Sequence, residues 1–185
     1  MSNSAALVFP AVQGDQVPAA SRPILEKVQK GFGFVPNLFA AFSNSPLLLE
    51  GYLALDTAYS KGTLSAAERQ LVLLAASVVN ECSYCIAAHS TVAKGMLKVP
   101  PTVVVAIRAQ QPVADTKLNA LVNLTRELVL GRGHVAPATV ESFINVGYRN
   151  DQIGEVLIGV ALKTMSNYTH HLSPVPIDSA FKAEA

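Results

Sequence analysis

The residues of this sequence best suited to do chemistry are two cysteines and a histidine. Cys82 and Cys85 form the chain's single C-x-x-C, and His89 follows four residues after the second cysteine. In a helix each residue turns by about 100°, so these steps place the three side chains on one face, about one turn apart. Two close thiols can form a disulfide, and an imidazole one turn from Cys85 can take its proton. The pattern predicts thiol redox chemistry, such as peroxide reduction or disulfide exchange.

The sequence leaves open which sulfur would be the reactive thiolate. A helix that begins near Cys82 would favour a thiolate there, through the partial positive charge at its N-terminus. A hydrogen bond across one turn from His89 would favour Cys85 instead. The three residues could also ligate a metal ion, but structural zinc usually has four ligands, and no second cysteine pair is present. We therefore favour redox chemistry over metal binding.

The elements that must position this motif are predicted to be helices. A nearly all-apolar helix is expected from Ser65 to about Asn80, with a capping box formed by Ser65 and Glu68. The motif helix should follow from about Cys82 to Leu97. Further helices are expected near residues 21–30, 38–42, 46–60, 101–109, 115–130, 137–146 and 151–168. The sequence thus predicts an all-α fold of about eight helices, with the C-x-x-C at the start of a core helix.

The domain organisation follows from the same pattern. Residues 1–20 should form an extended N-terminal segment, residues 21–172 one helical domain, and residues 173–185 an extended tail. Two histidines at the end of the last helix, His170 and His171, suit the negative end of the helix dipole, or one of them lines a pocket near the motif.

The composition argues against several classes of protein. Only 15% of the 185 residues are charged, against about 25% in a typical soluble domain, which predicts a homo-oligomer with a buried interface. A net charge of +1 and the absence of Trp argue against nucleic-acid binding. The longest apolar run, Leu71–Val79, is far shorter than the roughly 20 residues of a membrane helix. The first ten residues lack the pattern of a signal peptide, so we expect a cytoplasmic protein.

The motif and its surroundings resemble a known family. The stretch Glu68-Arg69-Gln70-Leu71-Val72-Leu73-Leu74-Ala75-Ala76-Ser77, followed by Asn80-Glu81-Cys82-Ser83-Tyr84-Cys85 and Ala87-Ala88-His89, is similar to the core of the carboxymuconolactone decarboxylase superfamily. Within it, the sequence resembles the alkyl hydroperoxidase D (AhpD)-like, peroxidase-related branch. Looser similarities, such as Gly33-Phe34-Val35-Pro36-Asn37 and Leu162-Lys163-Thr164-Met165-Ser166-Asn167-Tyr168, extend it from about residue 20 to 178.

This resemblance implies an oligomeric all-helical fold and a peroxide substrate. It implies that Cys85 attacks the peroxide and becomes a sulfenic acid, and that Cys82 then condenses with it to a disulfide. His89 would be the general base for Cys85. An external dithiol reductant, a thioredoxin-like or lipoyl-type carrier, would reduce the disulfide, and no cofactor is required. The number of subunits stays open between dimer, trimer and hexamer.

Two positions depart from the family pattern. Gln70 stands where the family has a glutamate of a proton relay, and Tyr84 stands where it has a histidine. Glu68 is the nearest acidic residue, but on a helix it points nearly opposite to Gln70 and is explained by the capping box. We expect Gln70 to hydrogen-bond to Cys82, a water or Tyr84, and turnover to be weak.

Two other functions stay open. One is the lactone decarboxylation for which the superfamily is named, although its members with that activity do not depend on a C-x-x-C. The other is a redox sensor or interaction protein that forms the disulfide without turning over peroxide.

Overall fold

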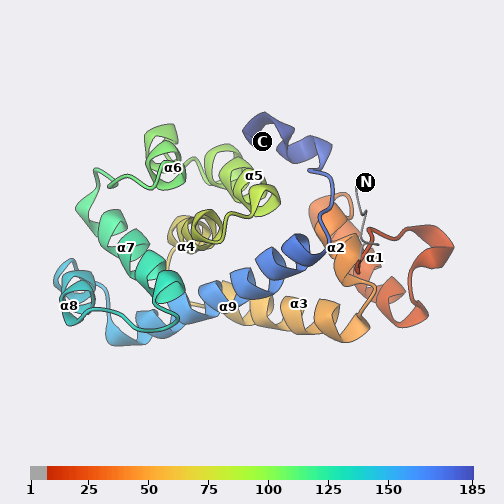
Figure 1. The fold of residues 1–185 in the computed structure, drawn as a ribbon, viewed down its shortest axis with the longest axis horizontal. Helices are drawn as coiled ribbons and strands as arrows, with labels where there is room; N and C mark the ends of the chain where they lie inside the picture. Colours follow the sequence, from red (N-terminus) through yellow and green to blue (C-terminus); the bar gives the residue numbers. More distant parts are fainter. Residues whose placement is uncertain (1–7) are drawn as a thin grey trace, which may run out of the picture.

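The computed structural model describes residues 8–185, and over this range the chain is helical with no β-strand. The predicted all-α class is therefore confirmed, and the fold is shown in Figure 1. The α-helices are α1 (Arg22–Phe32), α2 (Asn37–Phe42), α3 (Pro46–Ser60), α4 (Ala66–Val79), α5 (Ser83–Thr91), α6 (Pro101–Arg108), α7 (Thr116–Leu130), α8 (Pro137–Asn145) and α9 (Asn150–Leu172). Short turns of other helical types are η1 (Gly14–Gln16), η2 (Ala19–Ser21), η3 (Val92–Met96) and η4 (Ser179–Glu184).

Helix α4 is the centre of the molecule, as the apolar pattern predicts. Its residues 71–78 are all buried, and α5, α6, α7 and α9 pack around it (Figure 1). The predicted capping box is present: the Ser65 hydroxyl accepts from the Glu68 amide at 3.2 Å, and the Glu68 carboxylate accepts from the Ser65 amide at 2.8 Å. This cap fixes where α4 begins and thus the register of every residue that it contributes to the site.

A tight corner joins α4 to α5 and sets the direction of the motif helix. Glu81 has a left-handed backbone with φ of 56°. Its amide donates to the Val78 carbonyl at 3.0 Å, and the Cys82 amide donates to the Ser77 carbonyl at 3.0 Å. This pair of bonds is the Schellman motif, which is usually closed by glycine. The corner makes Cys82 the N-cap of α5 and leaves Cys85 in its first turn.

Helix α9 approaches the core closely through Gly159. A Cβ atom on this residue would lie 2.7 Å from Val72 of α4 and 2.8 Å from the Tyr59 hydroxyl of α3. The absence of a side chain lets α9 lie against both helices. One turn further along, Lys163 is held against the core at the level of α5.

The two ends of the chain differ in part from the predicted extended segments. Residues 1–7 of the predicted N-terminal segment lie outside the described residues, and the part from residue 8 to residue 20 includes the turns η1 and η2. The tail after Ser173 is extended only to Asp178 and then forms η4, beside α5 (Figure 1). Its Phe181 packs on Tyr84 and Phe34, which gives the last residues an apolar anchor and explains why they coil.

The motif helix also ends earlier than predicted. Helix α5 stops at Thr91, and the chain continues into the wider π-type turn η3 rather than as one α-helix to Leu97.

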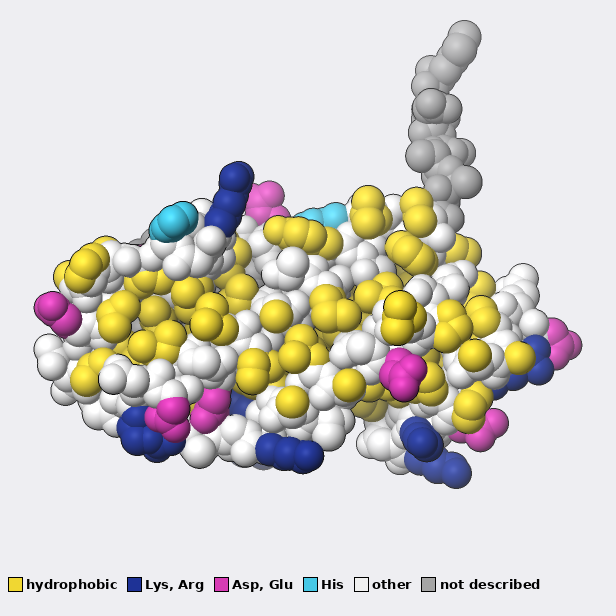
Figure 2. All heavy atoms as spheres, turned by 90° about the horizontal axis from the view of Figure 1, so that it is seen from below, with side chains coloured by type: hydrophobic (Ala, Val, Ile, Leu, Met, Phe, Trp, Pro, Cys, Tyr) yellow, Lys and Arg dark blue, Asp and Glu magenta, His cyan; other side chains and the backbone are white. Residues whose placement is uncertain are grey.

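The surface is rich in apolar side chains. Figure 2 shows hydrophobic groups spread over the face that lies below the view of Figure 1, with charged groups mostly toward its edges. Exposed examples are Leu47 on α3, 80% exposed, and Leu157 on α9, 47% exposed. In the described part of the chain, none of the helices has the length and hydropathy needed to cross a bilayer.

Candidate active site

The two cysteines lie at the start of α5, as the sequence predicts, and both are free thiols. Cys82 is fully buried and Cys85 is 2% exposed. They belong to a core cluster that also contains Tyr52 from α3 and Leu73 from α4. The dithiol is thus part of this apolar core, and α9 meets it at Ser166, whose hydroxyl lies 3.9 Å from the Cys85 sulfur.

The surroundings divide the two sulfurs into a donor and an acceptor. Hydrogen bonding from the Cys82 thiol lowers the pKa of Cys85 to about 6, against the opposing effect of burial, and the Lys163 charge and the Ser166 hydroxyl act in the same direction. The same hydrogen bond, together with burial, raises the pKa of Cys82 far above its usual range. The pair thus favours a thiolate on Cys85 and a thiol on Cys82, although Cys82 is the residue at the helix N-terminus.

His89 does not contact Cys85 as the helical spacing predicts. Its Nε2 lies 2.7 Å from the Lys163 ammonium nitrogen, and its Nδ1 lies 2.7 Å from Gln70 Nε2. Among the described residues, no hydrogen bond joins His89 to Cys85. The reason is that α9 inserts Lys163 beside the imidazole and occupies the ring nitrogen that would otherwise be free. Burial, and then the Lys163 charge, hold the pKa of His89 well below its usual range, so the ring is neutral.

Gln70 contacts His89 rather than Cys82 or Tyr84, which corrects the expectation from the sequence. Its Nε2 also donates to the His89 carbonyl at 3.4 Å. A neutral imidazole carries one N–H, so the two partners of the ring must play opposite roles. When Lys163 is an amine that accepts from Nε2–H, Gln70 donates to Nδ1. When Lys163 is an ammonium that donates to Nε2, the amide of Gln70 must turn to present its oxygen to Nδ1–H.

Lys163 is the site residue that the sequence reasoning missed. It is 1% exposed in the middle of α9, and its Nζ lies 3.4 Å from the Tyr52 hydroxyl and 5.8 Å from the centre of that ring. Burial opposes the charge, but Tyr52 and Cys85 outweigh it and raise the pKa of Lys163. The available signal was a lysine on the apolar face of a long helix, followed at the third and fourth positions by Ser166 and Asn167.

Asn167 ties the same face of α9 to the end of α4. Its side-chain oxygen accepts from the Asn80 amide at 2.9 Å, and its nitrogen donates to the Ser77 hydroxyl at 3.4 Å. Lys163, Ser166 and Asn167 therefore form a buried polar stripe on α9, and that stripe faces the dithiol corner.

Tyr84 lies in the site helix but its hydroxyl is directed away from the sulfurs. It donates to the Asp178 carboxylate at 2.5 Å and accepts from the Leu38 amide at 3.4 Å. Asp178 also accepts from the Asn37 amide at 3.2 Å. Tyr84 thus holds the C-terminal tail against α2 and α5, and it stacks near His170, with ring centres 5.6 Å apart.

The remaining polar candidates have structural contacts. Besides its role in the cap, the Glu68 carboxylate accepts a hydrogen bond from the Tyr148 hydroxyl at 2.7 Å. Its hydrogen bonds are therefore with Ser65 and Tyr148, and not with His89. The buried His170 accepts from the Val175 amide at 3.4 Å, and His171 is exposed. Among residues 8–185, no group of three His, Cys, Asp or Glu side chains is arranged to hold a metal ion.

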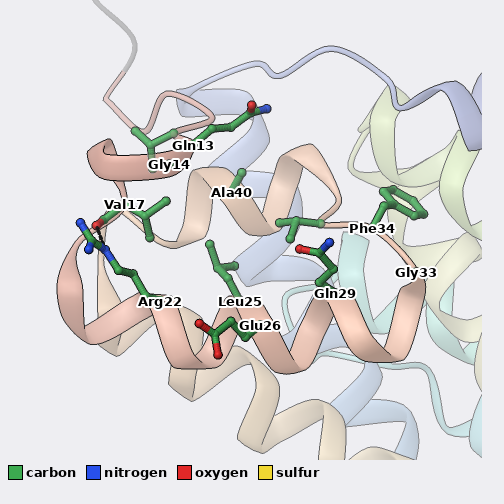
Figure 3. Close-up of a pocket in the computed structure, with 12 residues that line it drawn as sticks. Gln13, Gly14, Val17, Arg22, Leu25, Glu26, Gln29, Gly33, Phe34 and Ala40 are labelled. Carbon is green, nitrogen blue, oxygen red and sulfur yellow. Dashed lines mark hydrogen bonds between the residues drawn. The ribbon is translucent and has the colours of Figure 1, made fainter.

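A cavity of about 490 Å³ lies apart from the dithiol, between α1, the N-terminal segment that contains η1, and α2 (Figure 3). Arg22, Leu25, Glu26, Gln29 and Phe34 line it, with neither cysteine nor His89 among its walls. The Arg22 guanidinium is already engaged with the Val17 carbonyl at 3.1 Å.

The sequence matches a known family over the part of the chain that carries the site. Residues 46–127 match the model of the carboxymuconolactone decarboxylase family, a segment that runs from α3 into α7 and includes Gln70, the cysteines and His89. The resemblance predicted from the sequence is therefore confirmed. No match was found among the curated proteins compared with the sequence.

Solved structures with the same fold are peroxidase-related proteins and a debrominase. A peroxidase-related protein from Silicibacter sp. TM1040 is 19% identical with a TM-score of 0.80, over 97% of this chain and 94% of that chain. One from Ralstonia eutropha JMP134, described as an alkylhydroperoxidase AhpD core, is 21% identical with a TM-score of 0.81, over 94% and 93%. A cysteine-to-alanine variant of the debrominase Bmp8 in complex with 2,3,4-tribromopyrrole is 17% identical with a TM-score of 0.80, over 98% and 96%. The fold is thus AhpD-like.

Proposed function

We propose that the protein is a thiol-dependent peroxidase that reduces peroxides through the Cys82–Cys85 dithiol. The observation that carries the proposal is the pair of buried free thiols at the start of α5, with the Ser166 hydroxyl 3.9 Å from the Cys85 sulfur. The pKa of Cys85 is lowered and that of Cys82 is raised, because one thiol donates to the other. A thiolate beside a protonated thiol is what a peroxidatic and a resolving cysteine require.

The proposed reaction has three balanced steps. The Cys85 thiolate attacks the terminal peroxide oxygen, the O–O bond breaks, and Cys85 becomes a sulfenic acid. The departing alkoxide takes one proton from the solvent and leaves as the alcohol. The Cys82 thiol then forms the disulfide, and the sulfenic oxygen leaves as water. An external dithiol, of the thioredoxin-like or lipoyl type, reduces the disulfide and is itself oxidised. The two sulfurs carry this chemistry without a metal, haem or flavin.

His89 has a changed part in this proposal. Since its ring nitrogens contact Gln70 and Lys163, it acts on the lysine rather than as the direct base of Cys85. Gln70 fixes the ring in turn. Tyr84 supports the helix that carries the cysteines through its bond to Asp178.

The proposed setting is a homo-oligomer in the cytoplasm. The low fraction of charged residues and the exposed apolar side chains of α3 and α9 support a surface that a second copy covers. A reducing cytoplasm would supply the dithiol and keep the cysteines free. Light scattering at micromolar protein concentration tests the assembly, and a monomer would contradict it.

Peroxide consumption in the presence of dithiothreitol tests the activity. Cys85→Ser should abolish it, whereas Cys82→Ser should leave a sulfenic acid on Cys85 that dimedone traps after one equivalent of peroxide. A sulfenic acid trapped only on Cys82, in the Cys85→Ser variant, would reverse the assigned roles. Formation of the disulfide without sustained peroxide consumption would indicate a redox sensor instead.

A second candidate is reductive removal of a halogen, favoured by the similarity to the debrominase over nearly the whole chain. Two thiols would supply two electrons, hydrogen would replace bromine on the ring, and bromide would leave as the disulfide forms. Bromide release from 2,3,4-tribromopyrrole tests this activity. Carbon dioxide release from a lactone acid tests decarboxylation, which should survive loss of either cysteine.

A further inference from the structure

Lys163 is a lysine in a place where a charged side chain is costly. Its side chain is 1% exposed, and taking an ammonium out of water is strongly unfavourable unless an anion compensates it. Its nearest partners, Tyr52 and His89, are neutral at neutral pH. Within the described residues, no carboxylate lies within 4.0 Å of its nitrogen. The buried cation therefore lacks a conventional counter-ion.

The packing of α9 on α5 brings Cys85 to the side of α9 that carries Lys163. Ser166, one turn after Lys163 on α9, lies against Cys85, and Lys163 itself lies against His89, one turn after Cys85 on α5. The two helices are antiparallel here, because the later residue of α9 contacts the earlier residue of α5. The Lys163 nitrogen and the Cys85 sulfur therefore both lie between α5 and α9. Lys163 thus lies one helical turn from the contact between Ser166 and the Cys85 sulfur.

The other ionisable groups nearby do not offer a better partner. They are Tyr52 and Asp56 on α3, Arg69 on α4, and Cys82, Cys85 and His89 on α5. Asp56 feels the Lys163 charge, which lowers its pKa, but partial desolvation outweighs that effect and raises the pKa. Its carboxylate forms no ion pair with Lys163 within 4.0 Å. Arg69 is engaged with backbone carbonyls of the loop before α4, among them that of Gly62 at 3.4 Å. Hydrogen bonding to Cys85, together with burial, raises the pKa of Cys82, so Cys82 stays a neutral thiol.

We propose that Lys163 is the counter-ion of Cys85, whose buried ammonium holds this sulfur as a thiolate, while His89 and Gln70 hold the ammonium in place. Lys163 is in this sense a positioning residue, and the inference deepens the proposed function, on which its catalytic meaning rests. The thiol–amine and thiolate–ammonium forms differ only by one proton moved from sulfur to nitrogen. Gln70 serves both forms, because its amide can donate to or accept from the His89 ring.

The ultraviolet absorbance of the thiolate tests this inference without peroxide and without access of a reagent to the buried sulfur. The titration is measured in a Cys82→Ser background, which keeps a hydroxyl donor, and the signal of the Cys82→Ser, Cys85→Ser double variant is subtracted. Lys163→Met should raise the thiolate midpoint by roughly 1–3 pKa units, the usual effect of removing a nearby opposite charge. Lys163→Arg should keep it close to that of the Lys163 protein.

Two further variants separate charge from fold. Lys163→Gln keeps a hydrogen-bond donor but no charge, so its midpoint should rise as in Lys163→Met. Lys61→Met, which removes an exposed lysine at the end of α3, should leave the midpoint in place. Circular dichroism checks that each variant is folded. If Lys163→Met unfolds, the thiolate midpoints of Lys163→Arg and Lys163→Gln are compared instead.

An unchanged midpoint in folded Lys163→Gln or Lys163→Met would overturn the inference. So would a raised midpoint in Lys163→Arg equal to that of Lys163→Gln. A low midpoint that depends on Lys163, in a protein that consumes no peroxide, would leave the ion pair standing and refute only the peroxidase. Peroxide consumption that persists in Lys163→Gln, with an unchanged thiolate midpoint, would leave the peroxidase standing and refute the ion pair.

Discussion

Replacing Gln70 by Glu should convert the Gln70–His89–Lys163 chain into a proton relay with a titratable end. The new carboxylate would stand where the amide stands, 2.7 Å from His89 Nδ1. An anion at this distance from an imidazole raises its pKa by roughly 1–3 units. At about 1.36 kcal/mol per unit, the carboxylate would favour the protonated ring by about 1.4–4 kcal/mol. The fold should persist, since Gln70 is only half-buried and the two side chains have nearly the same shape.

The effect on stability has a definite sign. The pKa of His89 in the folded protein lies below its ordinary value, because burial and Lys163 disfavour the charged ring. The unfolded chain therefore binds this proton more readily, and folding free energy is lost as the pH falls through about 6.5. In Gln70→Glu the folded pKa moves up toward the unfolded value, so this loss should shrink. Urea unfolding at neutral and mildly acidic pH measures the difference.

Two measurements check the reasoning directly. Nitrogen-15 NMR of the histidine rings should show His89 titrating at higher pH in Gln70→Glu, with the other three histidines unchanged and Gln70→Met as the uncharged control. The peroxidase rate should rise and acquire a new acidic limb. A His89 ring that titrates identically in both proteins would refute the assigned contact, because the two groups could not then be in hydrogen bond.

Three further perturbations test the surrounding structure. Glu68→Gln should cost at most about 1 kcal/mol of unfolding free energy in urea, since glutamine also serves a capping box. It should leave the peroxidase rate nearly unchanged. A loss of peroxidase activity as complete as that of Cys85→Ser would make Glu68 the relay acid. Glu81→Gly should raise stability by up to about 1 kcal/mol because φ is 56° there, whereas Asn80→Gly, at a φ of −82°, should lower it; a loss in Glu81→Gly would contradict the assigned corner. Tyr84→Phe should cost about 1.5–3 kcal/mol and speed proteolysis of the C-terminal tail, with the thiolate midpoint unchanged; a shifted midpoint would place the hydroxyl in the proton path.

The local features of this protein could be predicted from its sequence, because they depend on neighbours in the chain. The capping box of α4, its apolar residues and the place of Cys82 at the start of α5 all follow from short-range rules. The corner at Glu81 could not be predicted, since its left-handed backbone lacks the glycine that usually marks such a turn.

The contacts within the site could not be predicted, because they depend on which helix packs opposite. Helical spacing places His89 within reach of Cys85, and that inference is correct as geometry on an isolated helix. It fails in the folded chain because Lys163 arrives from a segment 74 residues away and takes the ring nitrogen. The same limit applies to Tyr84, whose hydroxyl is directed to Asp178 at the far end of the chain.

The identity of residue 70 decides how the site can store a proton. A glutamate there only accepts, so it fixes the proton of a neutral His89 on Nδ1 and requires Lys163 to donate to Nε2. A glutamine accepts or donates, so the ring can follow Lys163 through both of its protonation states without a net charge at position 70. If Lys163 and Cys85 share one proton, as proposed, Gln70 adds no charge of its own to the balance between the thiolate and the lysine. In Gln70→Glu the carboxylate can raise the thiolate midpoint of Cys85 by itself. Loss of the Lys163 charge should then shift that midpoint less than it does in the protein with Gln70. A Gln70→Glu, Lys163→Gln double variant in the Cys82→Ser background measures this coupling, and strictly additive shifts would contradict a shared network.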